Sequence, residues 1–227
     1  MMQVATLPQA NIPFVCYLVR TGDGTNVLID SGLPANVQPP EGRPMPAMGK
    51  NVVEQLAELG LQPADIHLLV CTHFDGDHAG NHATFQKAEL VVQRAHYELA
   101  RSGSPRFAGI REQWDHPALR YHLIEGDVEL LPGLQLIETS GHTHGHQSVL
   151  VRLPASGPVL LTIDAVPNRS AFTPERQHGP ADEDPEALRA STRKLLDLVQ
   201  REHVSLVIFG HDGEQWQTLK KAPEYYD

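Results

Sequence analysis

The stretch that decides the fold is residues 71–80, which read CTHFDGDHAG. It contains His73, Asp75, Asp77 and His78, four side chains of types that bind metals. Histidine and carboxylate together suit borderline divalent metals such as zinc, manganese, iron and cobalt. Adjacent Asp77 and His78 could not face the same way on a strand, so we predict a loop that wraps around its ligand. For this stretch alone, a polar turn before a short helix is the alternative.

Apolar segments elsewhere in the chain also run directly into residues that can bind a metal. LLVCTH ends at His73, LQLIETSGH at His142, LLTID at Asp164, LVIFGH at His211 and VLID at Asp30. If these segments are neighbouring strands of one layered core, their ends converge at one edge, where α/β proteins place their sites. This convergence favours a metal site over a simple turn.

Composition limits the class of protein. The 227 residues suit a single α/β domain spanning 1–227. The net charge of −10 and the absence of a basic stripe argue against nucleic acid as a partner. Apolar runs are too short for a membrane span, and the N-terminus lacks the features of a signal peptide, so a cytoplasmic protein is expected. Cys16 and Cys71 lie in apolar runs and are predicted to be reduced.

Periodicity and turn residues predict the main elements. Residues 12–31 read as two strands around a Gly-Asp-Gly turn. A helix is predicted from residue 51 to about 60, and another from 185 to about 202 with an aspartate and a proline at its start. Residues 34–49 are proline-rich and predicted to be a long loop, and residues 101–118 look irregular.

The motif His73-x-Asp75-x-Asp77-His78 resembles the H-x-H-x-D-H signature of the metallo-β-lactamase superfamily. Gly141-His142-Thr143, Asp164 after LLTI and His211 after VIFG follow in the order of that family. The segments IEGDVELLPGLQLIETSGHTHGHQSVLV, VLLTIDA and IFGHDGEQW are most similar to the N-acyl-homoserine lactonases, which hydrolyse bacterial quorum-sensing signals (quorum quenching). The similarity extends from about Ile12 to the C-terminus.

The resemblance implies an αββα sandwich of two mixed sheets flanked by helices, with two divalent metal ions and a small-molecule substrate, as a monomer or homodimer. A hydroxide between the metals would attack the carbonyl of a lactone or another activated ester. Asp77 and Asp164 would take part in catalysis as well as in ligation. The implied ligands are His73, Asp75 and His142 for one metal, Asp77, His78 and His211 for the other, and Asp164 as the bridge.

Two positions depart from the lactonase pattern. Asp75 stands where the signature has its second histidine, so three aspartates would face two divalent metals and leave about +1 in the site. Weaker Lewis acidity is expected, and zinc is favoured, with iron or manganese possible because the site is richer in oxygen. Pro167 stands where the lactonases carry a tyrosine that contacts the substrate carbonyl. Another tyrosine could supply that contact, and the candidates are Tyr97, Tyr121, Tyr225 and Tyr226.

Several further residues have two interpretations. Asp30 resembles the aspartate that orients a ligand histidine in the family, or it is a residue of a turn at a strand end. His146 has a family counterpart that supports the ligands. Phe107, Trp114 and the 34–49 loop could wall an apolar acyl pocket or be ordinary packing. Beyond these, no substrate-binding residue can be assigned from the sequence.

Three alternative functions remain open on the sequence. The first is a hydrolase of the same fold that acts on a thioester, phosphodiester or sulfate ester. The second is a non-hydrolytic di-iron redox protein, since the redox proteins of this superfamily carry a glutamate at the position of Asp75. This chain, however, has no flavin-binding domain. The third is an inactive metal-binding protein, against which the near-complete ligand set argues.

Overall fold

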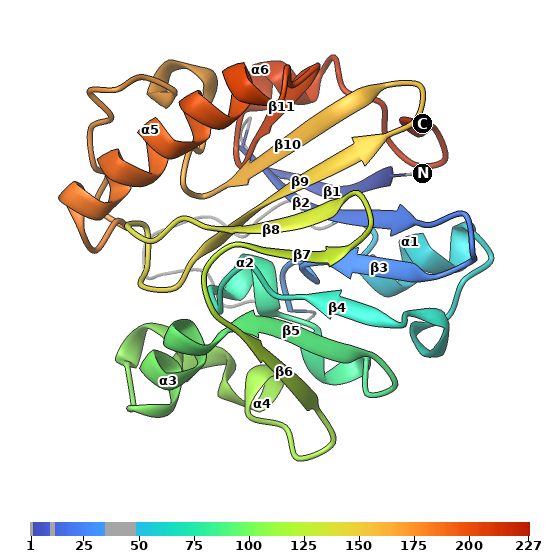
Figure 1. The fold of residues 1–227 in the computed structure, drawn as a ribbon. Helices are drawn as coiled ribbons and strands as arrows, with labels where there is room; N and C mark the ends of the chain where they lie inside the picture. The colour runs from blue at the N-terminus through green and yellow to red at the C-terminus, as the bar shows by residue number, and fades with distance from the viewer. Residues whose placement is uncertain (1, 10–11, 35–48) are drawn as a thin grey trace.

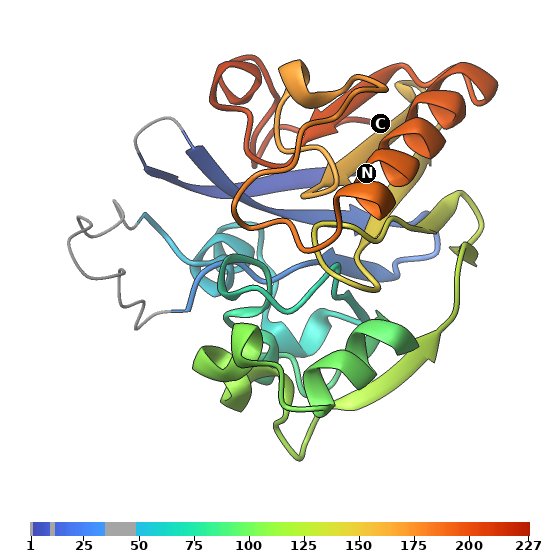
Figure 2. The ribbon, with the colours of Figure 1, turned by 90° about the vertical axis from the view of Figure 1, so that its left-hand side faces the viewer.

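The computed structural model describes residues 2–9, 12–34 and 49–227 of the chain. Two mixed β-sheets lie against each other, and helices cover their outer faces (Figures 1 and 2). The αββα sandwich expected from the sequence is therefore confirmed.

The first sheet has six strands and the second has five, each in mixed orientation. In spatial order the first sheet comprises β1 (Met2–Gln9), β2 (Ile12–Arg20), β3 (Asn26–Ile29), β4 (Leu68–Val70), β5 (Glu89–Gln93) and β6 (Arg120–Ile124). The second comprises β11 (Leu206–Phe209), β10 (Gly157–Ile163), β9 (Gln147–Leu153), β8 (Leu134–Glu138) and β7 (Val128–Leu131).

Helices and short 3₁₀ turns connect the strands. The α-helices are α1 (Val52–Glu58), α2 (Gly76–Ala79), α3 (Arg94–Arg101), α4 (Arg111–Trp114), α5 (Pro185–Arg201) and α6 (Gly213–Trp216). The 3₁₀ turns are η1 (Pro63–Asp65), η2 (His82–Thr84), η3 (Pro105–Ile110) and η4 (Arg169–Ala171).

Alternation along the strands sorts the buried side chains into three clusters. In β2, Tyr17 and Val19 point into the cluster between the two sheets, while Cys16 and Leu18 point to the outer side of the first sheet. That outer cluster is completed by side chains of α1, α3 and α4. A third cluster packs α5 against the outer face of the second sheet. Three apolar clusters between four layers fix the two sheets and leave their ends free to form a site.

The two long predicted helices form where their capping residues indicate. Asn51 accepts a hydrogen bond from the Glu54 N–H, and the Glu54 side chain accepts one from the Asn51 N–H, which closes a capping box at the start of α1. Asp184 caps α5 by accepting from the Glu186 and Ala187 N–H groups. The predicted hairpin around residues 22–24 is also confirmed, as β2 and β3 pair antiparallel.

The structure differs from the sequence prediction in several places. The strand expected over LLVCTH is shorter, because only Leu68–Val70 pair as β4. Segment 101–118 contains η3 and α4 rather than irregular chain alone, and β1 is an element that the sequence does not predict. The proline-rich loop at 34–49 lies almost wholly outside the described residues.

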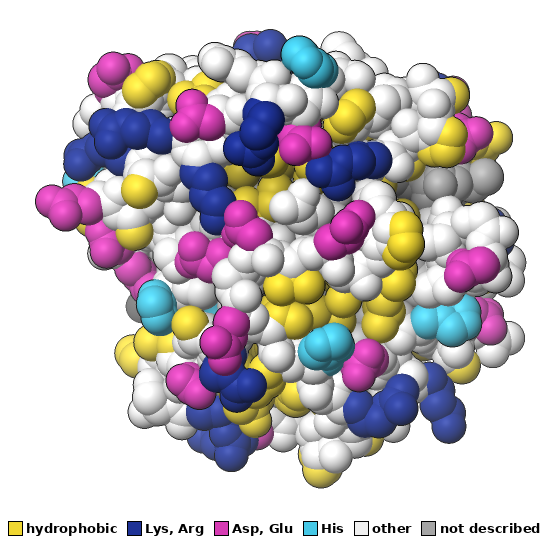
Figure 3. All heavy atoms as spheres, viewed as in Figure 1, with side chains coloured by type: hydrophobic (Ala, Val, Ile, Leu, Met, Phe, Trp, Pro, Cys, Tyr) yellow, Lys and Arg dark blue, Asp and Glu magenta, His cyan; other side chains and the backbone are white. Residues whose placement is uncertain are grey.

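The surface is polar and mixed in charge on the face drawn in Figure 3, where acidic and basic side chains are interspersed and apolar side chains show between them. Across the described residues, no helix combines the length and the apolar character needed to cross a membrane.

Candidate metal centre

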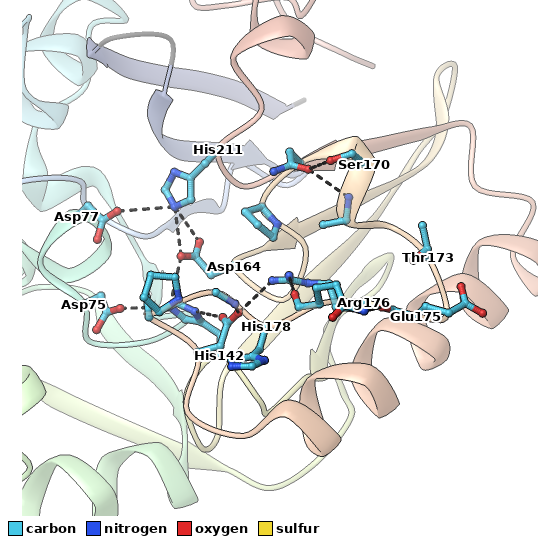
Figure 4. A pocket seen from close by; sticks show the side chains of 18 residues that line it. Asp75, Asp77, His142, Asp164, Ser170, Thr173, Glu175, Arg176, His178 and His211 are labelled. Carbon is cyan, nitrogen blue, oxygen red and sulfur yellow. Dashed lines mark hydrogen bonds and ion pairs between the residues drawn. The ribbon is translucent and has the colours of Figure 1, made fainter.

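Two groups of metal-binding side chains lie next to each other where strands of both sheets end. Figure 4 shows four of their members, Asp77, His142, Asp164 and His211. In each group, ligand atoms from three residues lie within 4.8 Å of one another. One group is His73, His142 and Asp164, and the other is Asp77, His78 and His211. The strand ends that the sequence predicted to converge do so.

The loop after β4 contributes three of these side chains, His73, Asp77 and His78, because it turns sharply away from the sheet. The carbonyl of Asp75 accepts hydrogen bonds from the N–H groups of His78 and Ala79, which starts α2. Gly80 then passes so close to the chain that a Cβ there would lie 2.3 Å from the Pro34 nitrogen and 2.5 Å from the Gly32 carbonyl oxygen. Only glycine fits this position, and the close approach fixes the end of the loop.

Asp164 joins the two groups. Its Oδ2 lies 3.4 Å from His142 Nε2 and 4.0 Å from His73 Nε2. Its Oδ1 lies 3.3 Å from His78 Nε2 and 3.1 Å from His211 Nε2, and its Oδ2 is also 3.1 Å from His211 Nε2. One carboxylate therefore presents an oxygen to each group, which is the geometry of a bridging ligand.

Two further carboxylates face the histidines: Asp75 stands beside the first group, and Asp77 belongs to the second. Asp75 Oδ2 lies 3.2 Å from His142 Nε2 and 3.5 Å from His73 Nε2. Asp77 Oδ2 lies 3.6 Å from His78 Nε2 and 3.8 Å from His211 Nε2. Such separations suit donor atoms that share one ion at about 2.0–2.2 Å from each.

Buried side-chain atoms that lack a hydrogen-bond partner show whether these residues suit a metal ion. Among the described residues, His73 Nε2, His78 Nε2 and Asp164 Oδ1 are buried with no hydrogen-bond partner. Leaving a buried polar atom unsatisfied costs about 1–3 kcal/mol. All three atoms point into the two groups, so a divalent cation in each would satisfy them.

Hydrogen bonds around the site orient two of the histidines. Asp30 accepts from the Thr72 hydroxyl at 2.7 Å and lies 2.8 Å from His78 Nδ1. His73 Nδ1 lies 3.1 Å from the Thr72 oxygen, whose only proton goes to Asp30, so His73 donates to it. Both histidines therefore carry their proton on Nδ1 and turn the Nε2 lone pair toward the site.

The other two histidines are held in the same way. His142 Nδ1 lies 2.9 Å from the carboxylate of Asp182, which also pairs with Arg176 at 3.3 Å. His211 Nδ1 lies 2.9 Å from the Pro13 carbonyl oxygen, a pure acceptor. The sequence does not indicate Asp182, since it lies in an irregular segment before α5.

His146 supports Asp164 through hydrogen bonds and does not face the two groups as a further donor. The Asp164 N–H donates to His146 Nε2 at 3.3 Å, and His146 Nδ1 lies 2.9 Å from the Thr139 hydroxyl. Burial and the neighbouring histidines lower the pKa of His146, so it is neutral. Both of its ring nitrogens are used, which leaves neither of them for a metal.

The cluster of carboxylates makes the site strongly attractive to cations. Burial alone would lower the pKa of His142, but Asp164, Asp182 and Asp75 together raise it to about 9. Burial likewise opposes the charge on His211, and Asp164 and Asp77 raise its pKa to about 9. Both histidines would hold protons near neutral pH where a metal does not replace them, so metal binding should release protons.

His96 connects the loop of residues 71–80, called here the ligand loop, to the rest of the site through hydrogen bonds. The sequence suggests no role for this residue. Its Nε2 accepts from the Phe74 N–H at 2.8 Å, between two proposed ligands, and its Nδ1 lies 2.8 Å from the His144 carbonyl oxygen. Gly145 packs on the same residue, so closely that a Cβ at this glycine would lie 2.5 Å from the His96 backbone nitrogen. Burial lowers the pKa of His96 to about 4, which keeps the ring neutral.

A cavity of about 660 Å³ opens beside the two groups. Asp75, Asp77, Asp164 and His211 form its floor, and its outer wall is segment 167–182. The wall contributes polar side chains, among them Asn168, Ser170, Thr173 and Arg176.

Of the two interpretations of Phe107 and Trp114, an acyl wall or ordinary packing, the described residues around this cavity favour packing. Phe107 and Trp114 are buried and pack on Phe74, so ordinary packing is their role. Pro167 does line the cavity. None of the four candidate tyrosines, Tyr97, Tyr121, Tyr225 and Tyr226, is among the described residues that line it.

Comparison with known proteins agrees with this geometry. The sequence pattern of the Metallo-beta-lactamase superfamily matches residues 15–211. An N-acyl homoserine lactonase of a Bacillus species is 37% identical over 226 residues, which cover 95% of this chain and 87% of the relative. The N-acyl homoserine lactonase AttM of Rhizobium johnstonii is 36% identical over 234 residues, with 95% and 88% covered.

Solved structures lead to the same group of proteins. An N-acyl homoserine lactone hydrolase with its product, N-hexanoyl-L-homoserine, bound at the catalytic metal centre superposes with a TM-score of 0.84 at 34% identity, over 95% of this chain and 87% of that one. A quorum-quenching N-acyl homoserine lactone hydrolase superposes with a TM-score of 0.87 at 30% identity, over 99% and 97%.

Proposed function

Because the chain belongs to the metallo-beta-lactamase superfamily, we propose that it is a metal-dependent hydrolase that opens the ring of N-acyl homoserine lactones. The observation that carries the proposal is the pair of adjacent groups around Asp164, whose buried Nε2 and carboxylate atoms lack partners. Relatives covering most of the chain are lactonases, which favours a lactone over other esters.

The proposed ligands are those the sequence suggested. His73, Asp75 and His142 would hold one divalent ion, Asp77, His78 and His211 the other, and Asp164 both. Ions held there would polarise an ester carbonyl and make water at the site more acidic. Zinc is the expected metal, with iron or manganese as alternatives, and the cytoplasmic location and the monomeric or homodimeric state stay predictions.

The protein's own residues would do three things in this reaction. Asp30, Asp182 and the Pro13 carbonyl keep the Nδ1 protons in place, so that each ligand histidine offers its Nε2 lone pair. His146 holds the backbone of Asp164. Attack by water releases a proton, and ring opening needs one for the departing alcohol oxygen. Asp77, one of three carboxylates on the cavity floor, would accept the proton from the water and pass it to the alcohol oxygen.

The cavity wall bears on how the substrate is held. Ser170 already donates to Asn168 Oδ1 at 2.7 Å and Arg176 to Asp182 at 3.3 Å, so both stabilise the wall itself. The Asn168 amide nitrogen and the Thr173 hydroxyl offer hydrogen-bond donors to the polar amide and lactone groups of an acyl homoserine lactone. They would take over the contact that a tyrosine makes in the lactonases, since Pro167 has no donor. Polar contacts of this kind fix orientation, whereas the acyl chain contributes chiefly through its apolar area.

A substrate panel tests the proposal with one variant and one control. The full-length protein loaded with zinc should release protons from N-hexanoyl homoserine lactone and be inert toward a thioester, a phosphodiester and a sulfate ester. His78→Ala removes one ligand atom and should lower both the rate and the bound metal by at least about 100-fold. His122→Ala, on β6 and half exposed, should change neither. Proton release that is faster with another ester than with the lactone would refute the assignment.

A further inference from the structure

The guanidinium of Arg106 is bound to the carboxylate of Asp75. Its Nε donates to Asp75 Oδ1 at 2.7 Å and its Nη2 to Oδ2 at 2.5 Å. Both side chains are only 19% exposed. Two parallel charge-assisted hydrogen bonds between planar groups are the strongest form of this ion pair, and they set direction as well as distance.

Arg106 also reaches the segments on either side of Asp75. Its Nη1 donates to the Ala181 carbonyl at 2.7 Å and lies 3.3 Å from Glu183 Oε1. Its Nη2 lies 2.8 Å from His142 Nε2, a proposed ligand atom of the group formed by His73, His142 and Asp164. One side chain of η3 thus joins the ligand loop, a ligand histidine and the wall of the cavity.

This contact changes the charge expected of the site. From the sequence, Asp75 adds a negative charge where the signature has a neutral histidine. The structure adds the positive charge of Arg106 in direct contact with it, so the pair together is as neutral as the histidine it replaces. Burial would raise the pKa of Asp75, but hydrogen bonds from Arg106 and His142 hold it well below its usual range.

We propose that Asp75 and Arg106 act as one unit, in which Arg106 is the positioning residue that compensates and aims the carboxylate at the second position of the motif. The proposal rests on the metal-dependent function proposed above. It follows that neither residue can be changed alone without cost. Changing both to neutral residues should restore a working site.

The test is a cycle of full-length proteins: wild type, Asp75→His, Arg106→Gln and the double variant. Each is measured for its Tm without metal and for its affinity for Zn²⁺ by competition with a chelating dye. Arg106→Gln should lower the metal-free Tm of the wild type, because a mostly buried carboxylate loses its partner. The same change should raise the Tm of Asp75→His, because there it removes a mostly buried cation that has lost its two-fold carboxylate partner.

Zinc affinity separates positioning of the site from ordinary stabilisation. Asp75→His alone should bind Zn²⁺ at least about tenfold more weakly than the wild type, since the guanidinium next to His142 has lost its two-fold carboxylate partner and repels the ion. The double variant should return to within about threefold of the wild type. Arg106→Lys keeps the charge but loses the two-fold contact. Its affinity for Zn²⁺ should therefore lie between those of the wild type and Arg106→Gln.

Arg152→Gln is the matched control, because it breaks a 2.8 Å ion pair with Glu202 on the surface. It should leave zinc affinity unchanged. If Asp75→His folds poorly, Asp75→Asn replaces it, and Arg106→Gln should again raise rather than lower its Tm. Additive Tm shifts, or zinc affinities equal across the cycle, would overturn the proposal. Neither result depends on lactone opening, so a failure of the proposed function is detected separately.

Discussion

Asp30 shows how one residue combines a backbone and a side-chain role. It has a left-handed backbone conformation, with φ of 59°, at the end of β3. Its carboxylate also accepts from the Thr72 N–H and hydroxyl and lies 2.8 Å from His78 Nδ1. The sequence leaves a turn residue and an orienting residue as equal alternatives, and the structure contains the features of both.

Asp30→Asn separates the two roles, because asparagine tolerates the left-handed conformation but cannot accept at both side-chain atoms. We expect metal affinity and the kcat/KM for lactone opening to fall about 10–100-fold, while the fold is retained. Isothermal titration with Zn²⁺ and the proton-release assay measure the two quantities. Asp23→Asn, in the exposed hairpin turn, is the control. An Asp30→Asn protein indistinguishable from this control would leave only the turn role.

Some residues of the site could be predicted from the sequence and others could not. The seven proposed ligands could be named because each lies in a dense motif or directly follows an apolar strand. Arg106 and Asp182 lie in irregular segments, where no periodicity indicates a partner. Their partners, Asp75 and His142, are 31 and 40 residues away in the chain. Only the folded arrangement brings such pairs together.

At the scale of elements, α3 supports the site through His96. The ring lies between the ligand loop and the loop around His144, and it accepts from one and donates to the other. It must be neutral and protonated on Nδ1 to do both. A helix outside the ligand set therefore positions two loops, and its contribution depends on the charge of one side chain.

This arrangement predicts a dependence of stability on pH. The unfolded His96 has a pKa near 6.5, and the folded one is lowered to about 4 by burial. As the pH falls below 6.5 the unfolded chain takes up a proton that the folded protein does not, so stability is lost until about pH 4. At pH 5 the loss from this residue is about 2 kcal/mol.

Urea unfolding at pH 7 and pH 5 measures the effect. His96→Gln can keep both hydrogen bonds without titrating, so its free energy of unfolding should fall about 2 kcal/mol less than that of the wild type over the same interval. The double difference removes the contribution of the other histidines. Equal losses in the two proteins would show that His96 does not titrate in the way its burial implies.

Elements were predicted well where a local signal marks their ends. The capping residues Asn51 and Asp184 gave the starts of α1 and α5, and the Gly-Asp-Gly turn gave the β2–β3 hairpin. The strand before the ligand loop was predicted too long, since apolar character continues through Cys71 after the pairing of β4 has ended. The turn η3, which carries Arg106, has no periodic pattern at all.

At the scale of the whole molecule, the site lies where the ends of strands from both sheets meet. The sheets contribute proposed ligands from opposite sides, His73 following β4 and Asp164 and His211 following β10 and β11. The order of motifs along the chain was enough to predict this arrangement through family resemblance. The polar wall at 167–182 was not predictable, because it depends on how a long loop folds over the cavity.

The most direct test of the central claim is a titration of activity with metal. Full-length protein stripped by a chelator is supplied with increasing Zn²⁺, and the initial rate of proton release from N-hexanoyl homoserine lactone is recorded at each step. The rate should rise from near zero and level off at two equivalents of metal per chain. Full lactone opening by the stripped protein, or no opening with Zn²⁺, Mn²⁺ or Fe²⁺ at any ratio, would contradict the account.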